Sequence, residues 1–574
     1  MNIFEEYLSK ITALILKNQK SLELNNLNNF KGITVETPPS EFDFDLSCNA
    51  CLILAKLNKI NPKELAIKIK NLIIKEFRDF NSIDIAGPGF LNFKLNENAL
   101  ILNINKILEN RKVYGKRMSN KNYNIEFVSA NPTGPMHVGH CRGAIYGDVL
   151  ANLLKFNGNK VTKEYYINDY GNQITNFAKS VFLRIREIKY NEKFITKKDL
   201  YPGHYIIEIG KKIINSYKDE KFDNYEDNSD LLKKESLKHS MNLIKSDLKK
   251  LGIKHDNFFS ETVLVNNKLV DKAVKKLKAN NYVEDGYLDP PKGEANKDWK
   301  KTKRLIFKST LFGDDTDRAM QKNDGSWTYF ANDVAYHMDK VDREYDYLIN
   351  VLGADHTGYI KRITAAVSAL SNKKVKLNCK VCQLVKLYKD GRPFKMSKRS
   401  GDFISAQDLL NEVDKDSIRF MMLNRSNDVE LDFDFDKVLE KSKDNPVYYV
   451  QYSYARINSL FRTLNRNLDD KITLKSNELA LNNSEIKILR KVFEWPKIIE
   501  TASFKYEPHK IPYYLYELST LFHAYWSRGN EDQNFKFIED GKIKSNGTLA
   551  IITLVSIVIQ RGMNILGVSL PEKM

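Results

Sequence analysis

Two short segments contain residue types that bind phosphate. The first, Met136-His137-Val138-Gly139-His140, follows a strand-like stretch and a turn rich in Pro and Gly. A helix that begins near His137 would offer unpaired backbone N–H groups and a positive dipole end, which attract phosphate. His137 and His140 add donors on its first turn, and Gly139 leaves the backbone open to a base or ribose. Alone, such a match is often accidental, but between a strand and a helix it indicates a nucleotide site.

The second segment is basic and rich in turns. Six basic residues lie between Lys386 and Arg399, and the end of the run reads Lys395-Met396-Ser397-Lys398-Arg399. A pentavalent phosphate transition state spreads negative charge over several oxygens, and lysines that close on it stabilise that charge as it develops. The alternative interpretation is a solvated basic turn. It becomes less favoured when both segments are considered together.

These segments need a scaffold, and the sequence predicts one. A strand at 123–128, a helix at 137–157 and a strand at 160–167 form a β-α-β unit, the building block of a parallel sheet. A polar, Lys-rich helical stretch at about 175–300 reads as an insertion into this sheet. Further strands are expected at 303–309, 346–353 and 376–388, with helices at 333–341 and 358–371.

Two other regions flank the predicted sheet domain, which covers 114–405. The pattern of residues 1–113 predicts a small α+β domain, and that of residues 406–444 predicts a connecting stem. From 445 to 574 the pattern is helical. Helices are expected at 3–18, 46–57 and 63–77, and later at 409–423, 445–465, 484–501, 510–527 and 548–566.

Composition sets the class of protein. A chain of 574 residues suggests about three or four domains. Its 91 Lys and Arg exceed 73 Asp and Glu, for a formal charge of +18, which suits a polyanionic partner or merely a solvated surface. The most apolar run, Leu549 to Ile559, is shorter than a bilayer span, and the first residues lack the pattern of a secretion signal. We therefore expect a cytoplasmic protein without a membrane partner.

The cysteines form two Cys-x-x-Cys pairs, Cys48 with Cys51 and Cys379 with Cys382. Structural zinc pairs usually lie much closer in sequence than these two pairs do. The second pair falls in an alternating strand, where both thiols cannot share a face. Small buried thiols are the better interpretation, and we expect no structural metal.

The two phosphate-binding segments, in this order, closely resemble the signature motifs of class I aminoacyl-tRNA synthetases. Nucleotidyltransferases share the first motif but are much shorter and lack a helical tail. The resemblance implies a Rossmann-type catalytic domain that binds ATP, accompanied by Mg²⁺, and makes an aminoacyl-adenylate. His137 and His140 would stabilise the phosphates, and Lys395 with Lys398 would hold the pyrophosphate. The implied nucleotide contacts also include Met136, Gly139, Met396, Ser397 and Asp355.

Within this class, the chain resembles the arginyl-tRNA synthetases along essentially its whole length. That family activates L-arginine with ATP and transfers it to the 3′ end of its tRNA. The matching segments are Glu126 with 130–132, 166–173, 312–315, 329–337, 353–356 and the ending 566–572.

An arginine substrate carries a planar guanidinium with five N–H donors, which favours carboxylate partners. Tyr329 and Asp333 are spaced i, i+4, so one helical turn would present both on the same side. A core aromatic and a helix N-cap are the alternatives for these two residues. The family's arginine pocket maps onto them and onto Glu126, Ser129 and Asn131.

The resemblance also assigns roles. Asp333 would hold the guanidinium, while Ser129 and Asn131 would hold the amino-acid end. His356 stands where some members carry a glutamine, and Asp355 fits the ATP ribose better. Many arginine enzymes lack the second lysine motif and carry a lysine in the first loop, whereas this chain has Gly134 there.

The helical tail is rich in aromatic residues, and unpaired bases stack on such rings with about 1–3 kcal/mol per base. Most of these rings must form the core of the helical bundle. We expect Tyr452, Arg456, Trp526 and Arg528 to face RNA. In the family this all-α tail binds the anticodon, the N-terminal domain touches the tRNA elbow, tRNA is needed for activation, and the enzyme is usually a monomer without an obligate protein partner.

Two alternatives stay open at this point. A class I synthetase for another amino acid, such as cysteine, would use a zinc–thiolate site. A non-catalytic RNA-binding paralogue would keep the fold but lose the two phosphate-binding segments, and both are intact here.

Overall fold

The computed structural model describes residues 2–25, 30–39, 41–195, 197–288, 302–394 and 404–574. The chain forms two compact units. One contains Met118–Glu440 with Glu507–His509, and we call it the catalytic unit. The other contains Met1–Arg117, Lys441–Tyr506 and Lys510–Met574. Each unit is described by itself.

A five-stranded parallel sheet forms the centre of the catalytic unit, in the order β12-β11-β5-β6-β7. From β5 the chain adds β6 and β7 on one side, and later β11 and β12 on the other. The order therefore reverses between β5 and β11, and ligands of such sheets bind at the carboxyl ends of the strands at this point. The strands are β5 (Asn122–Glu126), β6 (Lys160–Ile167), β7 (Asn257–Ser260), β11 (Tyr347–Gly353) and β12 (Lys376–Cys382).

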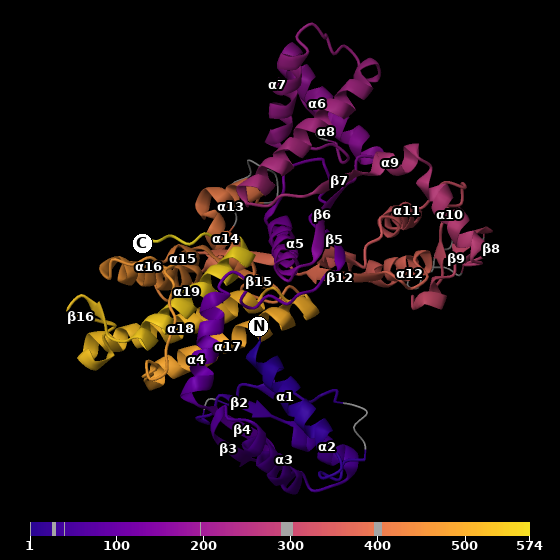
Figure 1. The fold of residues 1–574 in the computed structure, drawn as a ribbon. Coiled ribbons are helices and arrows are strands. Elements are labelled where there is room, and N and C mark those ends of the chain that lie inside the picture. The colour runs from indigo at the N-terminus through magenta and orange to yellow at the C-terminus, as the bar shows by residue number, and fades with distance from the viewer. Residues whose placement is uncertain (1, 26–29, 40, 196, 289–301, 395–403) are drawn as a thin grey trace. The chain divides into compact units, whose positions relative to one another are not determined.

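Helix α5 (Val138–Phe156) joins β5 to β6 and is buried along most of its length (Figure 1). It approaches the segment after β5 closely, because a Cβ on Gly147 would lie 2.3 Å from the Phe127 ring. Inside the unit, Asp148 of this helix pairs with Lys163 at 2.6 Å and with Arg419 at 2.6 Å. Gly147 and the ion pairs of Asp148 therefore fix α5 against the sheet and the stem.

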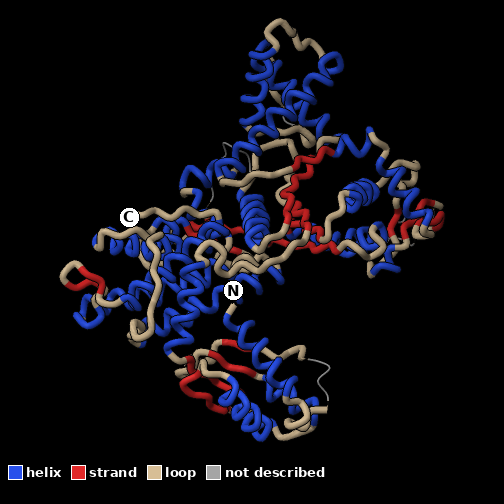
Figure 2. Tube along the Cα trace, in the orientation of Figure 1, coloured by secondary structure: helices blue, strands red, loops and turns tan. Residues whose placement is uncertain are grey.

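The insertion is mainly helical, as α6 (Asn172–Tyr190), α7 (His204–Ser216) and α8 (Tyr225–Lys250) show in Figure 2. They share a core around Phe177, Ile209 and Phe222. The insertion also supplies β7, an edge strand that the sequence interpretation missed. Shorter helices follow at α9 (Glu261–Asn266) and α10 (Leu269–Ala279).

One expected strand lies outside the parallel sheet, and another joins it only in part. The stretch at 303–309 becomes β9 (Arg304–Phe307), which pairs antiparallel with β8 (Val283–Gly286) and β10 (Arg318–Ala319). The stretch at 376–388 divides into β12 and β13 (Val385–Lys389). Strand β13 pairs with β14 (Arg392–Pro393) and runs parallel to β15 (Leu431–Asp434).

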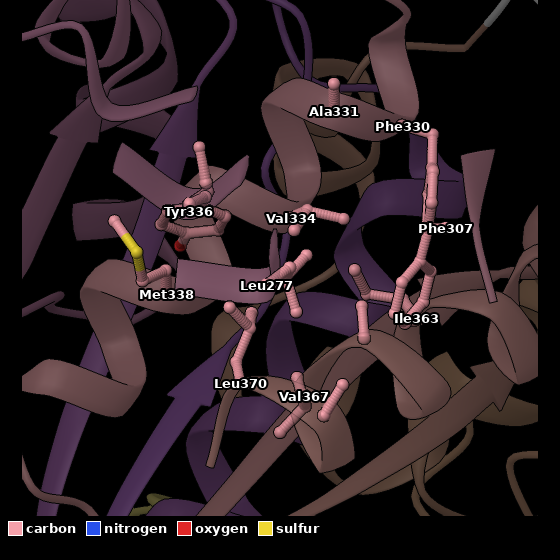
Figure 3. Packing of buried hydrophobic residues seen from close by; sticks show 14 of the residues in the cluster. Leu277, Phe307, Phe330, Ala331, Val334, Tyr336, Met338, Ile363, Val367 and Leu370 are labelled. Carbon is pink, nitrogen blue, oxygen red and sulfur yellow. The ribbon is translucent and has the colours of Figure 1, made fainter. Parts of the chain in front are cut away.

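Helices α11 (Tyr329–Asp342) and α12 (Ile360–Leu370) pack against each other and against α10, and α12 also contacts β12. Figure 3 shows Val334 and Tyr336 of α11 in one buried cluster with Ile363 and Val367 of α12 and Leu277 of α10. This packing fixes the face of α11 that carries Asp333. The stem adds α13 (Ala406–Glu412), α14 (Lys415–Met422) and α15 (Phe435–Leu439).

The second unit combines a small sheet domain with a helical bundle. Its four-stranded sheet has the order β1-β2-β4-β3, with β1 (Val35–Glu36), β2 (Leu46–Cys48), β3 (Phe80–Ala86) and β4 (Phe90–Leu95). Helices α1 (Ile3–Lys17), α2 (Ala50–Asn58) and α3 (Pro62–Glu76) pack on this sheet, and α4 (Glu97–Glu109), which follows β4, contacts α19 (Asn546–Leu566) of the bundle. The bundle consists of α16 (Pro446–Thr463), α17 (Asn483–Lys505), α18 (Lys510–Glu531) and α19, with a hairpin of β16 (Ile538–Glu539) and β17 (Lys542–Ile543).

Helix α19 ends where the sequence predicted and begins two residues before the expected 548–566. Its 21 residues are long and apolar enough to cross a membrane by length and composition, which corrects the expectation that no stretch was. In the structure, 83% of its most apolar window is buried. It is the core helix of the bundle, in contact with α16, α17 and α18.

Candidate active site

The first phosphate-binding segment lies at the start of α5, as its sequence predicted. The helix begins at Val138, with His137 as its N-cap residue. The backbone N–H of His137 donates to Nδ1 of His140 at 3.2 Å, and the two rings stack with centroids 3.7 Å apart. Because Nδ1 of His140 accepts this bond, the proton of the neutral ring lies on Nε2.

Both histidines are neutral near pH 7. Burial lowers the pKa of His137, and burial together with His137 lowers the pKa of His140 to about 3, although the charge of Asp355 acts in the other direction. Each ring can therefore donate a hydrogen bond without carrying a charge. A Cβ on Gly139 would lie 2.9 Å from Cε1 of His137, so this glycine first of all makes room for the histidine ring.

The chain after the second phosphate-binding segment is hydrogen-bonded to the first. Val138 N donates to Ile404 O at 3.0 Å, and Ala406 N donates to Met136 O at 2.8 Å. His137 and Ser405 face each other in an antiparallel bridge. Lys395, Met396, Ser397 and Lys398 themselves lie outside the described residues. The described chain resumes after them at Ile404, which is bonded to the first turn of α5.

A cavity of about 360 Å³ opens at the carboxyl ends of β5 and β11, where the strand order reverses. Four of the residues predicted for arginine binding lie in its wall: Glu126, Ser129, Asp333 and His356. The remaining wall comes from the loop after β5, from β6 and β11, and from the helices that follow β10 and β11. These lining residues are Val128, Tyr166, Tyr336, His337, Asn350, Val351, Leu352, Gly353, Tyr359 and Ile363.

Asp333 is the carboxylate of α11 that reaches this cavity. Burial raises its pKa to about 7, and the charges of Glu126 and Glu261 add to the rise, while a hydrogen bond from the Tyr359 hydroxyl and the charge of Lys340 oppose it. A cation that entered the cavity would favour the ionised form. The group is therefore suited to a charged partner such as a guanidinium.

Glu126, at the end of β5, is held by two neighbours. Nζ of Lys340 lies 2.5 Å from its Oε2, and the Ser129 hydroxyl donates to its Oε1 at 3.1 Å. The Lys340 side chain has 0% exposure and also donates to Oδ1 of Asn350 at 3.3 Å. The carboxylate of Glu126 is thus already paired with a buried cation, and Asp333 carries the charge that a basic substrate would meet.

His337 connects α11 to β11 beneath the cavity. Its Nδ1 bonds to the carbonyl of Asp333 at 2.8 Å, and its Nε2 to Nδ2 of Asn350 at 2.9 Å. Burial lowers its pKa to about 4, so the ring is neutral. The sequence interpretation missed His337 and Lys340, although both follow Asp333 at helical spacing, i+4 and i+7, and so had a detectable signal.

Other predicted residues lie outside this cavity. Tyr329 is 82% exposed and lines a neighbouring cavity of about 560 Å³ with Lys322 and Trp327. Oδ1 of Asn131 accepts a hydrogen bond from Asn168 at 3.3 Å. The structure therefore places Tyr329 and Asp333, one turn apart on α11, at different cavities.

Asp355 and His356 follow the end of β11. Their side chains are 80% and 58% exposed, and Nε2 of His356 lies 3.4 Å from Oδ2 of Asp355. The charge of Asp355 acts to raise the pKa of His140, against the larger effects of burial and of His137.

In the helical bundle, three of the four residues predicted to face RNA lie together. The Arg456 guanidinium lies 4.3 Å from the Tyr452 ring centroid and 5.3 Å from that of Trp526. All three line a cavity of about 410 Å³ with the C-terminal Met574. Arg528 lies apart from them, over the Phe535 ring at 3.7 Å.

None of the five cysteines forms a disulfide. Burial raises the pKa of Cys48 to about 11 and that of Cys382 to about 12, which keeps both as thiols. Cys379 and Cys382 lie three residues apart on β12, so their side chains point to opposite faces. Within the described part of the chain, no group of three or more His, Cys, Asp or Glu could hold a metal ion.

Three family models match the chain. They are described as the arginyl-tRNA synthetase N-terminal domain (residues 3–95), the catalytic domain of class I tRNA synthetases (R) (residues 103–461) and the DALR anticodon-binding domain (residues 450–574). Together they span nearly the whole sequence.

Individual relatives agree with these models. An arginine–tRNA ligase of Pelagibacter ubique is 56% identical over 100% of both chains, and one of Roseobacter denitrificans is 42% identical over 100% of both. An arginyl-tRNA synthetase structure from Campylobacter jejuni superposes with a TM-score of 0.73 at 31% identity, covering 84% of this chain and 100% of the other. The Thermus thermophilus arginyl-tRNA synthetase, at 18% identity, shares the fold with a TM-score of 0.71 over 99% of this chain and 100% of its own. The chain belongs to the arginyl-tRNA synthetases, the class I aminoacyl-tRNA synthetases that act as ATP-dependent arginine–tRNA ligases.

Proposed function

We propose that the cavity at the ends of β5 and β11 is the arginine site of this ligase. Asp333 pairs with the guanidinium, because it is the carboxylate of the cavity whose ionisation burial opposes and a cation would favour. Ser129 in the cavity wall and Asn131 in the loop just outside it hold the amino-acid end, with Glu126 fixed beside Ser129 by Lys340. The observation that carries this proposal is the convergence of Asp333 and Glu126, far apart in sequence, on one cavity.

ATP lies next to this cavity, along the first turn of α5. The α-phosphate is attacked by the carboxylate of arginine, so a new P–O bond forms as the bond to pyrophosphate breaks. Neutral His137 and His140 donate hydrogen bonds to the phosphates, and the helix N-terminus adds its partial positive charge. Met136 and Gly139 line the nucleotide, and Asp355 holds the ribose.

The second phosphate-binding segment, which we call the lysine segment, completes this step. Lys395 and Lys398 neutralise the departing pyrophosphate, while Met396 and Ser397 contact the nucleotide. Support comes from Ile404 and Ala406, which follow the segment directly and are hydrogen-bonded to Val138 and Met136. A magnesium ion would accompany the phosphates as part of the nucleotide substrate, where its charge offsets theirs.

In the second step, a ribose hydroxyl at the 3′ end of the tRNA attacks the carbonyl carbon of arginyl-adenylate. Arginine is thereby esterified to the tRNA and AMP leaves. We assign the N-terminal α+β domain to the tRNA elbow and the α16–α19 bundle to the anticodon. The cluster of Arg456 between Tyr452 and Trp526 supports the second assignment, since a guanidinium and aromatic rings together bind unpaired bases.

We further propose that the enzyme works in the cytoplasm as a monomer and without an obligate protein partner. The buried position of α19 in its bundle supports a protein that works away from membranes. Analytical ultracentrifugation of the purified chain tests the monomer, and a stable dimer or larger assembly would contradict it.

ATP–pyrophosphate exchange tests the amino-acid specificity. Each of the twenty amino acids is supplied in turn, with total tRNA present because the family resemblance implies that activation needs it. Arginine alone is expected to support exchange. Preference for another amino acid would overturn the assignment of the cavity, and the absence of exchange with any of them would favour a non-catalytic RNA-binding role.

A further inference from the structure

We propose that Arg142 is a positioning residue for adenylate formation. It holds β13, the strand that leads towards the lysine segment, in place against α5, whose N-cap residue is His137. The proposal rests on the function proposed above and adds a residue that does not touch substrate.

Arg142 lies on α5, two residues after His140, and is 1% exposed. Its Nη1 donates to the carbonyls of Gln383 at 2.9 Å and Val429 at 2.7 Å. Its Nη2 donates to the carbonyl of Ser426 at 2.8 Å. One guanidinium thus joins three points of the backbone to the histidine-bearing helix.

The three carbonyls belong to two segments that are themselves joined. Gln383 lies between β12 and β13, and its N–H donates to Asn427 O at 2.8 Å. Leu431 N donates to Leu384 O at 3.0 Å, where β15 begins to run parallel to β13. Arg142 therefore holds β13 and β15 at their shared amino ends, and β13 continues through β14 towards residues 395–403.

The chemistry of the contact suits a positioning role. A buried charge is costly unless it is well hydrogen-bonded, and these acceptors are neutral carbonyls and not carboxylates. Burial lowers the pKa of the Arg142 guanidinium, against smaller opposing effects of Cys382 and Asp428. A planar group with forked donors can satisfy carbonyls of two segments at once, which a lysine ammonium matches poorly.

The described residues on both sides of the lysine segment are therefore held to α5. After it, Ile404 and Ala406 are hydrogen-bonded to Val138 and Met136, and before it, β13 is held through Arg142. Lysines that meet charge only as it develops act on kcat and leave KM unchanged. Loss of Arg142 should therefore slow activation without weakening the binding of arginine.

The test separates the two half-reactions in Arg142→Lys and Arg142→Gln. Arginine-dependent ATP–pyrophosphate exchange, with tRNA present, is measured per active site as determined by titration. Transfer to tRNA is measured separately in a single turnover with synthetic arginyl-adenylate, which bypasses activation. We expect the exchange kcat to fall about tenfold to a hundredfold in both variants, as for a displacement of about 1 Å, with the KM for arginine and the transfer rate within about twofold of the parent.

Arg490→Lys is the matched control, because Arg490 is a structural arginine of the other unit that pairs with Asp45 at 2.7 Å and Asp43 at 2.8 Å. It should lower the melting temperature without changing either rate per active site. Proportional loss of exchange and transfer in the Arg142 variants, or full exchange in both, would overturn the positioning role. Failure of the parent enzyme to exchange with arginine would instead overturn the proposed function, so the two failures are distinguishable.

Discussion

His137 and Ser405 face each other in an antiparallel bridge, which joins the residue that caps α5 to the chain just after the lysine segment. Hydrogen bonds of 3.0 Å and 2.8 Å flank this bridge, from Val138 to Ile404 and from Ala406 to Met136. The start of α5 and the chain that directly follows the lysine segment are therefore neighbours.

Lys398→Ala tests this arrangement directly. Because Lys398 would meet the pyrophosphate as its charge develops, its loss should reduce adenylate formation by about two to three orders of magnitude. The affinity for tRNA should stay nearly unchanged, as measured by filter binding. Exposed Lys373 on the same unit is the matched control, and Lys373→Ala should leave exchange unaffected. Equal losses of exchange and tRNA affinity in Lys398→Ala would mean that the segment has another role.

His140→Ala should reduce adenylate formation by about a hundredfold to a thousandfold, as expected for one preorganised donor. The ring is neutral because burial and His137 lower its pKa to about 3. No titration of His140 should therefore appear in the exchange rate between pH 6 and 8 at saturating arginine. A bell-shaped profile in the parent that flattens in the variant would show that His140 acts as a general acid or base instead.

Asp333 should make arginine binding dependent on pH. Burial raises its pKa to about 7 in the free enzyme, so the carboxyl is largely neutral below that value. A neutral group attracts the guanidinium less, and arginine itself stays charged throughout this range. The KM for arginine in aminoacylation should therefore fall as the pH rises from 6 to 8.

Asp333→Asn should cost roughly 3–5 kcal/mol of binding free energy for arginine, which raises the KM for arginine. It should also abolish this pH dependence. The control is Asp342→Asn, further along α11, whose carboxylate is half exposed and pairs with Lys276 at 2.9 Å. That substitution should leave both the KM and its profile intact. A pH profile of Asp333→Asn that matches the parent would remove Asp333 from the arginine site.

Some of this site was predictable from the sequence. The helix that starts near His137 and the strand before it follow from periodicity and from the Pro and Gly residues of the turn, and the structure confirms both within a residue or two. Asp333 reaches the cavity together with His337, as helical spacing requires. These features are local, so local patterns carry them.

Other features depend on partners distant in sequence. Strand β7 has only four residues, and its apolar pair, Phe258 and Phe259, cannot be distinguished from a buried helical segment by periodicity. Strand β9 was recognised as a strand, but periodicity does not say which sheet a strand joins. Tyr329 is the first residue of α11, and helical side chains lean towards the N-terminus, so its ring extends past the helix start and away from Asp333.

Lys340 should be important for stability as well as for the cavity. Its buried ammonium lies 2.5 Å from Glu126, so Lys340→Met leaves a partly buried carboxylate without its cation. We expect a loss of about 3–5 kcal/mol in the free energy of unfolding of the catalytic unit, from urea denaturation. The double variant Lys340→Met with Glu126→Gln should recover part of this loss, because the unpaired charge is gone. Additive losses in the double variant would show that the two groups do not interact energetically.

The aromatic cluster of the bundle gives the last prediction. Arg456 lies between the rings of Tyr452 and Trp526, and all three line the same cavity, whereas Arg528 packs on Phe535 and donates to Ser484 at 2.9 Å. A base that stacks there contributes about 1–3 kcal/mol. Trp526→Ala and Arg456→Ala should therefore raise the KM for tRNA about tenfold to a hundredfold.

Arg528→Ala serves as the matched control within α18, the helix that also carries Trp526. Its effect on the KM for tRNA should be small. Arginine activation at saturating tRNA should be unchanged in all three variants, since the bundle is separate from the catalytic unit. The comparison also discriminates among the predicted RNA-facing residues. A larger effect of Arg528→Ala than of Trp526→Ala would move the anticodon contact away from the cluster and towards the face of α18 that carries Arg528.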